Sequence, residues 1–286
     1  WQRGTLPHQP ARDAGVPIAV AILTFMLIYL LIARSFALTL PFRAYLSEVR
    51  AVRDFYVANP LPQFLLGEFS QRGWPHYYLV AIAVKTPLPA LALMLIAIFR
   101  TRRFEAAVCL LFAALFLIVS AFSSLNLGIR HILPIFPFLF AACAISVSRG
   151  ITVMLVAAHV LTSLLAYPSY LSYFNPLIGS HRNADRVLID SNLDWGQDLR
   201  RLAKWTREND IDVIRVHYFG AGSVERELGA NGIRWPAPRK EPLPKGWFAL
   251  SRHFYRLNSG YDAYLRASGA RYVTTIGGSI DIYKVD

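Results

Sequence analysis

The chain has 286 residues, of which 55% are hydrophobic and 17% are charged, and its mean hydropathy is +0.36. A soluble domain carries about a quarter charged residues, so this composition favours a membrane protein over a soluble one. The net charge of +12 comes from basic residues scattered among hydrophobic segments. That distribution disfavours nucleic acid as a partner and favours membrane lipids or a phosphate-bearing substrate.

The chain begins with Trp1 and no signal peptide precedes its first apolar run, so we expect an N-terminal part of a longer protein to be missing. Cys109 and Cys143 lie in apolar runs and are expected to be small buried hydrophobic residues rather than disulfide or metal ligands. Neither a CxxC nor an HExxH pattern occurs. No cofactor is therefore expected, while dependence on a divalent metal ion stays open.

Five hydrophobic segments approach the roughly 20 residues that a membrane-spanning helix requires. They cover residues 16–33, 77–99, 105–123, 131–147 and 151–170. Basic connections around Arg102 and Arg149 place the loops after the second and fourth segments in the cytoplasm, because short basic loops stay on that side. Residues 34–76, 124–130 and those after about 171 are then expected on the extracytoplasmic face.

The first extracytoplasmic loop, residues 34–76, is expected to contain a basic amphipathic helix. Such a helix lies in the membrane interface, and a helix packed on the bundle is the alternative. Apolar residues recur in this loop at helical spacing, with basic residues between them: Phe42, Tyr45, Leu46, Val49, Val52 and Phe55.

After residue 174 the pattern changes to short strands that alternate with helices. We expect strands at 186–190, 212–219 and 247–251, helices at 198–209, 223–228 and 261–268, and a closing hairpin at 271–285 that turns at Gly277 and Gly278. The predicted fold class is thus a polytopic α-helical membrane protein with about five spanning helices. Its bundle, residues 1–174, precedes a small extracytoplasmic α/β domain, residues 175–286, with a largely parallel sheet.

Two basic positions are candidates for binding a phosphate. Lys85 lies inside an apolar segment, where a lysine is costly and marks a functional site unless its side chain extends to the interface. Pro87 and Pro89 are expected to break the helix just after it. Arg130 and His131 lie at the start of a span on the extracytoplasmic face, so the positive-inside rule does not explain them. A specific phosphate site is one interpretation, and an anchor to lipid headgroups is the other.

The stretch "DSNLDWGQDLRRL", residues 190–202, clusters three carboxylates. They could contact an acceptor at the end of a strand. Alternatively they form a structural cap, since Asp194 and Gln197 have the spacing of a capping box; the candidates are Asp190, Asn192, Asp194 and Gln197.

The stretch "GWPHYY", residues 73–78, is typical of an aromatic belt at a membrane entrance. Its rings could also stack on a sugar or a prenyl chain. The candidate substrate or lipid contacts are Trp74, His76, Tyr77 and Tyr78.

Four motifs together resemble bacterial membrane glycosyltransferases of family 39, a group related to protein O-mannosyltransferases and lipid A aminoarabinose transferases. They are "FLLGEFSQRGWPHYYLVAIAVKTPLPALAL", "NLGIRHILPIFPFLF", "YLSYFNPLIG" and "VLIDSNLDWGQDLRRL". The resemblance covers roughly residues 40 to 205. It implies a GT-C membrane fold and a sugar donor carried on a polyprenyl phosphate, with transfer on the extracytoplasmic face of the inner membrane.

The resemblance also implies residue roles. Lys85 and Arg130, with His131, would bind the donor phosphate. The acidic residue that serves the family as catalytic base has no counterpart here, because Asp54 and Glu68 stand in a different context. The catalytic residue is therefore unassigned and expected upstream, so that the chain is a C-terminal portion that can be inactive alone.

The leading hypothesis is a glycosyltransferase whose partners are a polyprenyl-phosphate sugar and membrane lipids, with no nucleic acid and with the acceptor unassigned. The alternative is a non-catalytic subunit that binds lipid phosphate or acts as a scaffold. A transporter is a weaker third, because transporters tend to show paired broken helices in related halves, and only the single "TPLP" break is present here.

Overall fold

The computed structural model describes residues 62–123, 126–235, 242–257 and 260–286, together with a few positions between 43 and 55. The chain forms two compact units, Trp1–Leu61 and Pro62–Asp286. In the first unit the described positions are helical and exposed: 43, 46–48, 50–51 and 54–55. The apolar stripe expected at 42, 45, 49 and 52 and the span expected at 16–33 lie outside the described residues.

The second unit opens with an antiparallel hairpin of β1 (Gln63–Leu65) and β2 (Glu68–Ser70). Neither strand is predicted from the sequence, because a three-residue strand carries too few side chains to show a period of two. Helices follow, with a 3₁₀ turn η1 (Ile129–Ile132) between the third and the fourth: α3 (Tyr77–Lys85), α4 (Leu88–Arg100), α5 (Phe104–Ala121), α6 (Ile135–Ser146) and α7 (Arg149–Ala166).

Pro87 and Pro89 break the expected second span into α3 and α4, as predicted. A proline has no N–H, so the carbonyls at the end of α3 lose their helical donors. Asn175 replaces them: its Nδ2 donates to Ala83 O at 2.5 Å and to Thr86 O at 2.7 Å, and its backbone N donates to Val84 O at 2.8 Å. These three carbonyls at the break in the helix are therefore hydrogen-bonded, whereas the buried Thr86 Oγ1 has no partner among the described residues.

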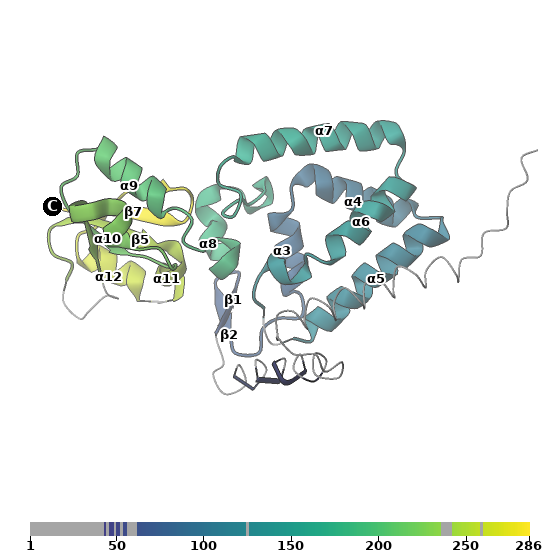
Figure 1. Cartoon of the computed structure of the whole chain (residues 1–286), viewed down its shortest axis with the longest axis horizontal. Coiled ribbons are helices and arrows are strands. Elements are labelled where there is room, and N and C mark those ends of the chain that lie inside the picture. Colours follow the sequence, from purple (N-terminus) through teal and green to yellow (C-terminus); the bar gives the residue numbers. More distant parts are fainter. Residues whose placement is uncertain are drawn as a thin grey trace, which may run out of the picture. The chain divides into compact units, whose positions relative to one another are not determined.

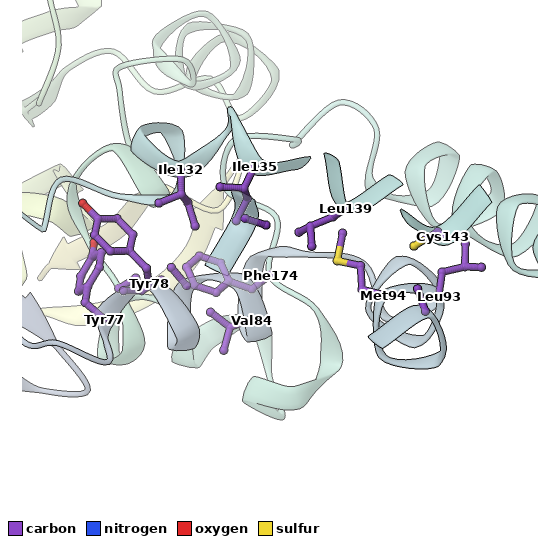
Figure 2. Close-up of a cluster of buried hydrophobic side chains, with 14 of the residues drawn as sticks. Tyr77, Tyr78, Val84, Leu93, Met94, Ile132, Ile135, Leu139, Cys143 and Phe174 are labelled. Atoms are coloured by element: carbon purple, nitrogen blue, oxygen red, sulfur yellow. The ribbon is translucent and has the colours of Figure 1, made fainter. Parts of the chain in front are cut away.

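The helices enclose a first hydrophobic core, in which Tyr77, Ile132 and Ile135 are almost completely buried (Figure 2). The two longest helices contribute least to it. Only Ala106 and Ala113 of α5 are buried, and α7 has no buried residue. By length and composition, α5 and α7 are apolar enough to cross a membrane, while α4 and α6 are apolar but shorter.

Residues 176–192 form short helical turns rather than a strand: η2 (Pro176–Ile178), η3 (His181–Asn183), α8 (Ala184–Val187) and η4 (Asp190–Asn192). The strand expected at 186–190 is therefore wrong. Leu188 and Ile189 are buried, but they pack as an isolated extended pair in which Asn192 Nδ2 donates to Ile189 O at 3.2 Å. A short apolar run has the same sequence signature in either setting.

The C-terminal part contains a five-stranded mixed sheet of order β4-β3-β5-β7-β6. β3 pairs in parallel with β4 and β5, and the closing hairpin adds β7 and β6 antiparallel, so the sheet is less parallel than expected. The expected strands around β3, β5 and the hairpin are confirmed, while β4 was missed. The bounds are β3 (Ile214–His217), β4 (Gly232–Arg234), β5 (Gly246–Ser251), β6 (Arg271–Ile276) and β7 (Ile280–Val285).

Helices cover both faces of this sheet (Figure 1). α9 (Leu199–Glu208) and α10 (Val224–Leu228) pack on one face, against Ala249 and Ile282. α12 (Tyr261–Ala267) packs on the other face, against Phe248 and Tyr283. Neighbouring residues of one strand thus serve opposite cores, as the two-residue period of a strand requires. The expected helices at 198–209, 223–228 and 261–268 are confirmed.

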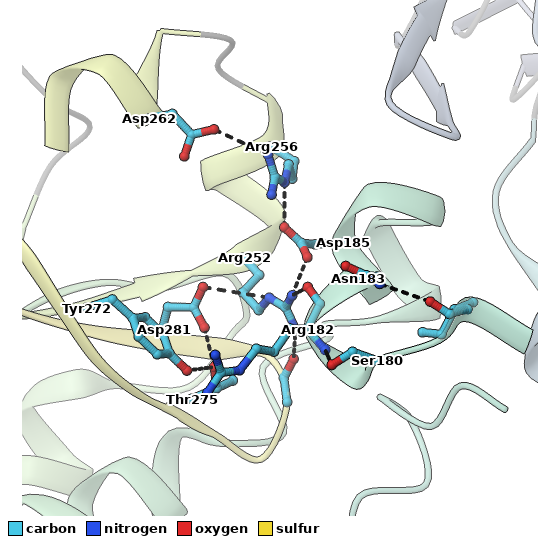
Figure 3. Close-up of polar contacts among 12 residues, drawn as sticks. Ser180, Arg182, Asn183, Asp185, Arg252, Arg256, Asp262, Tyr272, Thr275 and Asp281 are labelled. Carbon is cyan, nitrogen blue, oxygen red and sulfur yellow. Dashed lines mark hydrogen bonds and ion pairs between the residues drawn. The ribbon is translucent and has the colours of Figure 1, made fainter. Parts of the chain in front are cut away.

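The chain passes from the first core to the sheet's core between Leu193 and Leu199, beyond residue 174, where the sequence analysis divides its two domains. An ion-pair network helps to fix this passage (Figure 3). Asp185 of α8, almost fully buried, accepts hydrogen bonds from both Arg252 and Arg256 of α11 (Arg252–Leu257).

Gly277 lies where α9 meets the closing hairpin, and the expected effect of Gly277→Ala is a loss of about 3 kcal/mol or more in the free energy of unfolding. Its φ is +60°, and an added Cβ would lie 2.0 Å from the Asp198 carboxylate. The matched control is Gly269→Ala, which has φ +67° with no atom within 4 Å and should cost only about 1 kcal/mol. Thermal denaturation measures both, and equal losses would contradict the clash.

Candidate functional site

Asn192 joins three segments that are far apart in the sequence. Its side chain is buried, with Oδ1 accepting from Ile129 N at 3.0 Å and Nδ2 donating to Tyr77 Oη at 3.0 Å. Its backbone carbonyl accepts from Lys85 Nζ at 2.6 Å. The motifs around Lys85, Arg130 and Asp190 therefore meet at one residue, Asn192.

Lys85, predicted to bind a phosphate, is engaged with the protein itself. Its Nζ donates to Leu171 O at 2.7 Å as well as to Asn192 O, and lies 4.4 Å from the centroid of the Phe174 ring. An ammonium group has three donors, so at most one is left for a ligand. In this structure Lys85 therefore connects α3 to the segments around residues 171 and 192.

Arg130 and His131 are exposed in the η1 turn. Arg130 Nε donates to His131 Nε2 at 3.3 Å, and its guanidinium lies 4.8 Å from the centroid of the Trp195 ring. Within the described part of the chain it pairs with no carboxylate. A guanidinium held over an aromatic ring keeps other N–H groups for a ligand, and its forked donors match two oxygens of a phosphate.

Asp190 is a half-buried carboxylate near both histidines of the site. Its φ is +58°, a left-handed conformation that is uncommon outside glycine. Its backbone N–H donates to His253 Nδ1 at 3.0 Å, and its charge acts on both His131 and His253. Burial lowers the pKa of His253, and the charge of Asp190 opposes this shift in part. The ring is therefore neutral at pH 7, as an acceptor at Nδ1 must be.

Aromatic side chains from the turn before α9 and from the segments that follow β3 and β5 complete the surface. Trp195 is 53% exposed, and its ring packs edge-on against Phe219, 5.6 Å between centroids. Phe219 in turn lies 4.1 Å from the His253 ring. We call this group the Arg130–Trp195 surface; it consists of Arg130, His131, Asp190, Trp195, Phe219 and His253.

Two of the predicted aromatic contacts need correction. Tyr77 and Tyr78 are buried, with their rings 5.2 Å apart at 85° in the first core, so they have no free face for a sugar or a prenyl chain (Figure 2). The pair Tyr77–Tyr78 close to Trp74 resembles an interfacial belt because the sequence does not reveal which side of α3 is inside. Trp74 is partly buried, with its backbone N–H donating to Asn126 Oδ1 at 2.7 Å, and His76 is exposed.

The predicted capping box at Asp194 and Gln197 is wrong, because α9 begins at Leu199, with Asp198 as its N-cap residue. Instead, Asp194 Oδ1 accepts from Gly196 N at 2.8 Å, and its Oδ2 accepts a short hydrogen bond from Ser251 Oγ of β5. Gln197 Oε1 accepts from Trp195 N at 2.9 Å. The two side chains therefore shape the turn that presents Trp195 and attach it to the sheet.

Sequence reasoning did not single out Trp195, Phe219 or His253. Trp195 stands within a motif that it quoted, and an exposed aromatic beside turn residues is the signal that was available. Phe219 lies two residues after β3 and His253 lies in α11, which directly follows β5, so the pairing of β3 with β5 brings the two rings together beside Asp190. No local sequence pattern predicts which strands pair with each other.

Across the described residues, no group of three or more His, Cys, Asp or Glu side chains could hold a metal ion. Comparison with known proteins gives no family: no family model, no curated protein and no solved structure matches the chain. The function therefore has to be argued from the geometry of the site.

The buried Asp194 carboxyl predicts a measurable pH dependence of stability. Burial raises its pKa from 3.8 to about 6, so the folded protein holds a proton that the unfolded chain releases. Stability from this group therefore falls as the pH rises from about 4 to about 6, by about 3 kcal/mol at most, and then levels off.

Asp194→Asn, which mimics the protonated acid, should flatten this slope in thermal denaturation across that pH range. Asp212→Asn changes an exposed carboxylate of the same domain and is the matched control. An unchanged slope in Asp194→Asn would remove Asp194 as its cause.

Proposed function

We propose that the chain is part of a membrane glycosyltransferase that moves a sugar from a polyprenyl-phosphate donor to an acceptor on the extracytoplasmic face of the bacterial inner membrane. The observation that carries the proposal is the Arg130 guanidinium, exposed, stacked on Trp195 and without a carboxylate partner among the described residues. A cation held in this way suits a phosphate, and the exposed face of Trp195 beside it suits a sugar ring.

Membrane insertion is supported by the apolar surface of the helices. Val119 of α5 is 72% exposed and Leu165 of α7 is 78% exposed. Soluble monomers rarely expose contiguous apolar surface on this scale, whereas lipid chains would cover it favourably. The exposed large side chains on these two helices include Val108, Leu111, Leu115, Ile118, Val153, Met154, Val160, Leu161 and Leu164.

The proposed reaction develops charge next to Arg130. The acceptor hydroxyl oxygen attacks C1 of the donor sugar while the bond from C1 to the phosphate oxygen breaks, and polyprenyl phosphate leaves with the electron pair. The forked guanidinium of Arg130 stabilises the added negative charge, and His131 holds the guanidinium through Nε2. The hydroxyl proton passes to the carboxylate that the family resemblance assigns to the first extracytoplasmic loop.

Lys85 supports this surface from within the fold. By holding the carbonyl of Asn192, it fixes the turn whose amide fixes Ile129, next to Arg130. Lys85→Ala is consequently a poor test of catalysis, because the carbonyls of Leu171 and of the buried Asn192 would lose their donor and the fold itself would suffer.

Arg130→Gln in the full-length protein should lower kcat/KM for transfer from a polyprenyl-phosphate sugar by about 100-fold, because one charge-stabilising donor group is lost. The matched control, Arg207→Gln, changes an exposed arginine of α9 and should retain wild-type activity. Undiminished transfer by Arg130→Gln at normal expression would remove Arg130 from the mechanism. A wild-type protein that binds the lipid-linked donor without transferring its sugar would instead favour the non-catalytic binding subunit.

The proposed orientation predicts sided accessibility to a membrane-impermeant maleimide. In a variant whose native cysteines are replaced by alanine, Ser180→Cys should be labelled in intact spheroplasts, whereas Arg102→Cys should be labelled only after lysis. Both positions are exposed in the structure, so burial does not confound the comparison. The reverse pattern would overturn the orientation, and equal labelling of both in intact cells would overturn membrane insertion.

A further inference from the structure

A pocket lies in the C-terminal part, at the carboxyl ends of the parallel strands β3 and β4. Its volume is about 400 Å³, and its lining is largely aromatic: His217, Tyr218, Arg234, Trp235 and Phe254. In open sheets, ligands bind outside the carboxyl ends of parallel strands, where side chains from neighbouring strands converge. We call this cavity the β3–β4 pocket.

The walls of the β3–β4 pocket are held by contacts within the protein. The His217 ring stacks on Phe254, 4.5 Å between centroids and 2° between planes, and His217 Nδ1 lies 3.2 Å from Tyr261 Oη. Tyr218 Oη donates to Gly196 O at 2.6 Å, and Trp235 N donates to Val216 O at 2.8 Å. A ligand would therefore bind a preformed site, and little of the binding free energy would be lost in ordering these rings.

The polar groups at the β3–β4 pocket are mainly donors. Trp235 Nε1 is buried and has no acceptor within the described ranges, which is uncommon for a buried N–H. Arg234 makes only long contacts, 3.3 Å to Gly222 O and 3.9 Å to the carboxylate of Glu225, and its side chain is about half exposed. Among the described residues that line the pocket, none carries a carboxylate. Among the described residues, the pocket thus offers positive charge and one unpaired N–H to a ligand rich in oxygen.

These features narrow the chemical class of the ligand. An apolar molecule would leave the Trp235 N–H unpaired and Arg234 unused. A metal ion would find no carboxylate in the lining. A sugar ring has an apolar face of C–H groups that packs on aromatic rings, and hydroxyl oxygens that accept hydrogen bonds. An acidic substituent on that ring would pair with Arg234.

We propose that the β3–β4 pocket binds a sugar ring that carries a carboxylate, of the hexuronate class, with its ring against the aromatic walls and its carboxylate on Arg234. Binding of this kind does not depend on the transfer reaction proposed above, and it is measured without it.

The test is calorimetric titration of the full-length protein in lipid nanodiscs with methyl β-D-glucuronide and, separately, methyl β-D-glucoside. The wild type should bind the glucuronide saturably and about tenfold more tightly than the glucoside, because a charged hydrogen bond contributes about that factor. Arg234→Gln should abolish this preference and leave glucoside binding unchanged. Arg226→Gln, an exposed arginine on the neighbouring α10, is the matched control and should behave as the wild type.

Trp235→Phe supplies an independent arm, since it keeps an aromatic ring but removes the buried N–H, and it should weaken binding of both glycosides. Three results would overturn the proposal: no saturable binding of either glycoside by the wild type, equal affinity for the two, or an unchanged preference in Arg234→Gln. Because Arg234 has an exposed side chain, this variant stays informative even where Trp235→Phe folds poorly.

Discussion

The buried amide of Asn192 is the contact on which the arrangement of the first core depends. A buried amide has to satisfy its donors and its acceptor, and each of its partners here comes from a different part of the chain: Tyr77 in α3, Ile129 in η1 and Ile189 in its own turn. An unsatisfied group in this setting costs about 1–3 kcal/mol, so the three segments are constrained together rather than merely adjacent. Lys85 adds a charged hydrogen bond to the same residue.

Close packing reinforces this constraint at Gly128. Its φ is +99°, and an added Cβ would lie 2.9 Å from Ser191 Oγ and 3.0 Å from the Asn192 amide. The backbone of the η1 approach thus lies against the turn that contains Asn192. The base of the Arg130–Trp195 surface is therefore rigid, and the freedom to adapt to a ligand resides in the exposed ends of Arg130 and Trp195.

The elements that sequence predicted well are those whose pattern is strong and local. Side chains of β5 and β7 alternate between the two cores that flank the sheet, which gives these strands a period of two in the sequence. Helix α9 has an apolar stripe formed by Leu199, Leu202 and Ala203. Prolines at 87 and 89 fixed the end of α3 by removing donors. In each case the physical cause lies within a few residues of its effect.

The elements and contacts that the sequence did not predict depend on residues that are distant in the sequence. The apolar pair Leu188–Ile189 resembles a strand until its packing is known. The side of α3 that Tyr77 occupies is decided by Asn192, more than a hundred residues later. Lys85 was recognised as exceptional, yet its carbonyl partners at 171 and 192 belong to loops whose approach no local pattern predicts. The sequence therefore predicted which types of residue belong to the candidate site, but it did not predict which residues they contact.

The Arg130–Trp195 surface spans the junction of the two cores. Arg130 belongs to a turn packed in the first core, whereas Phe219 and His253 lie in the segments that directly follow β3 and β5 of the sheet. A ligand that contacts both sides binds only when both are folded, so its binding free energy adds to the stability of the junction and couples the unfolding of the two cores. Ligand binding to this surface would then increase the cooperativity with which the whole second unit unfolds, including parts that the ligand does not contact.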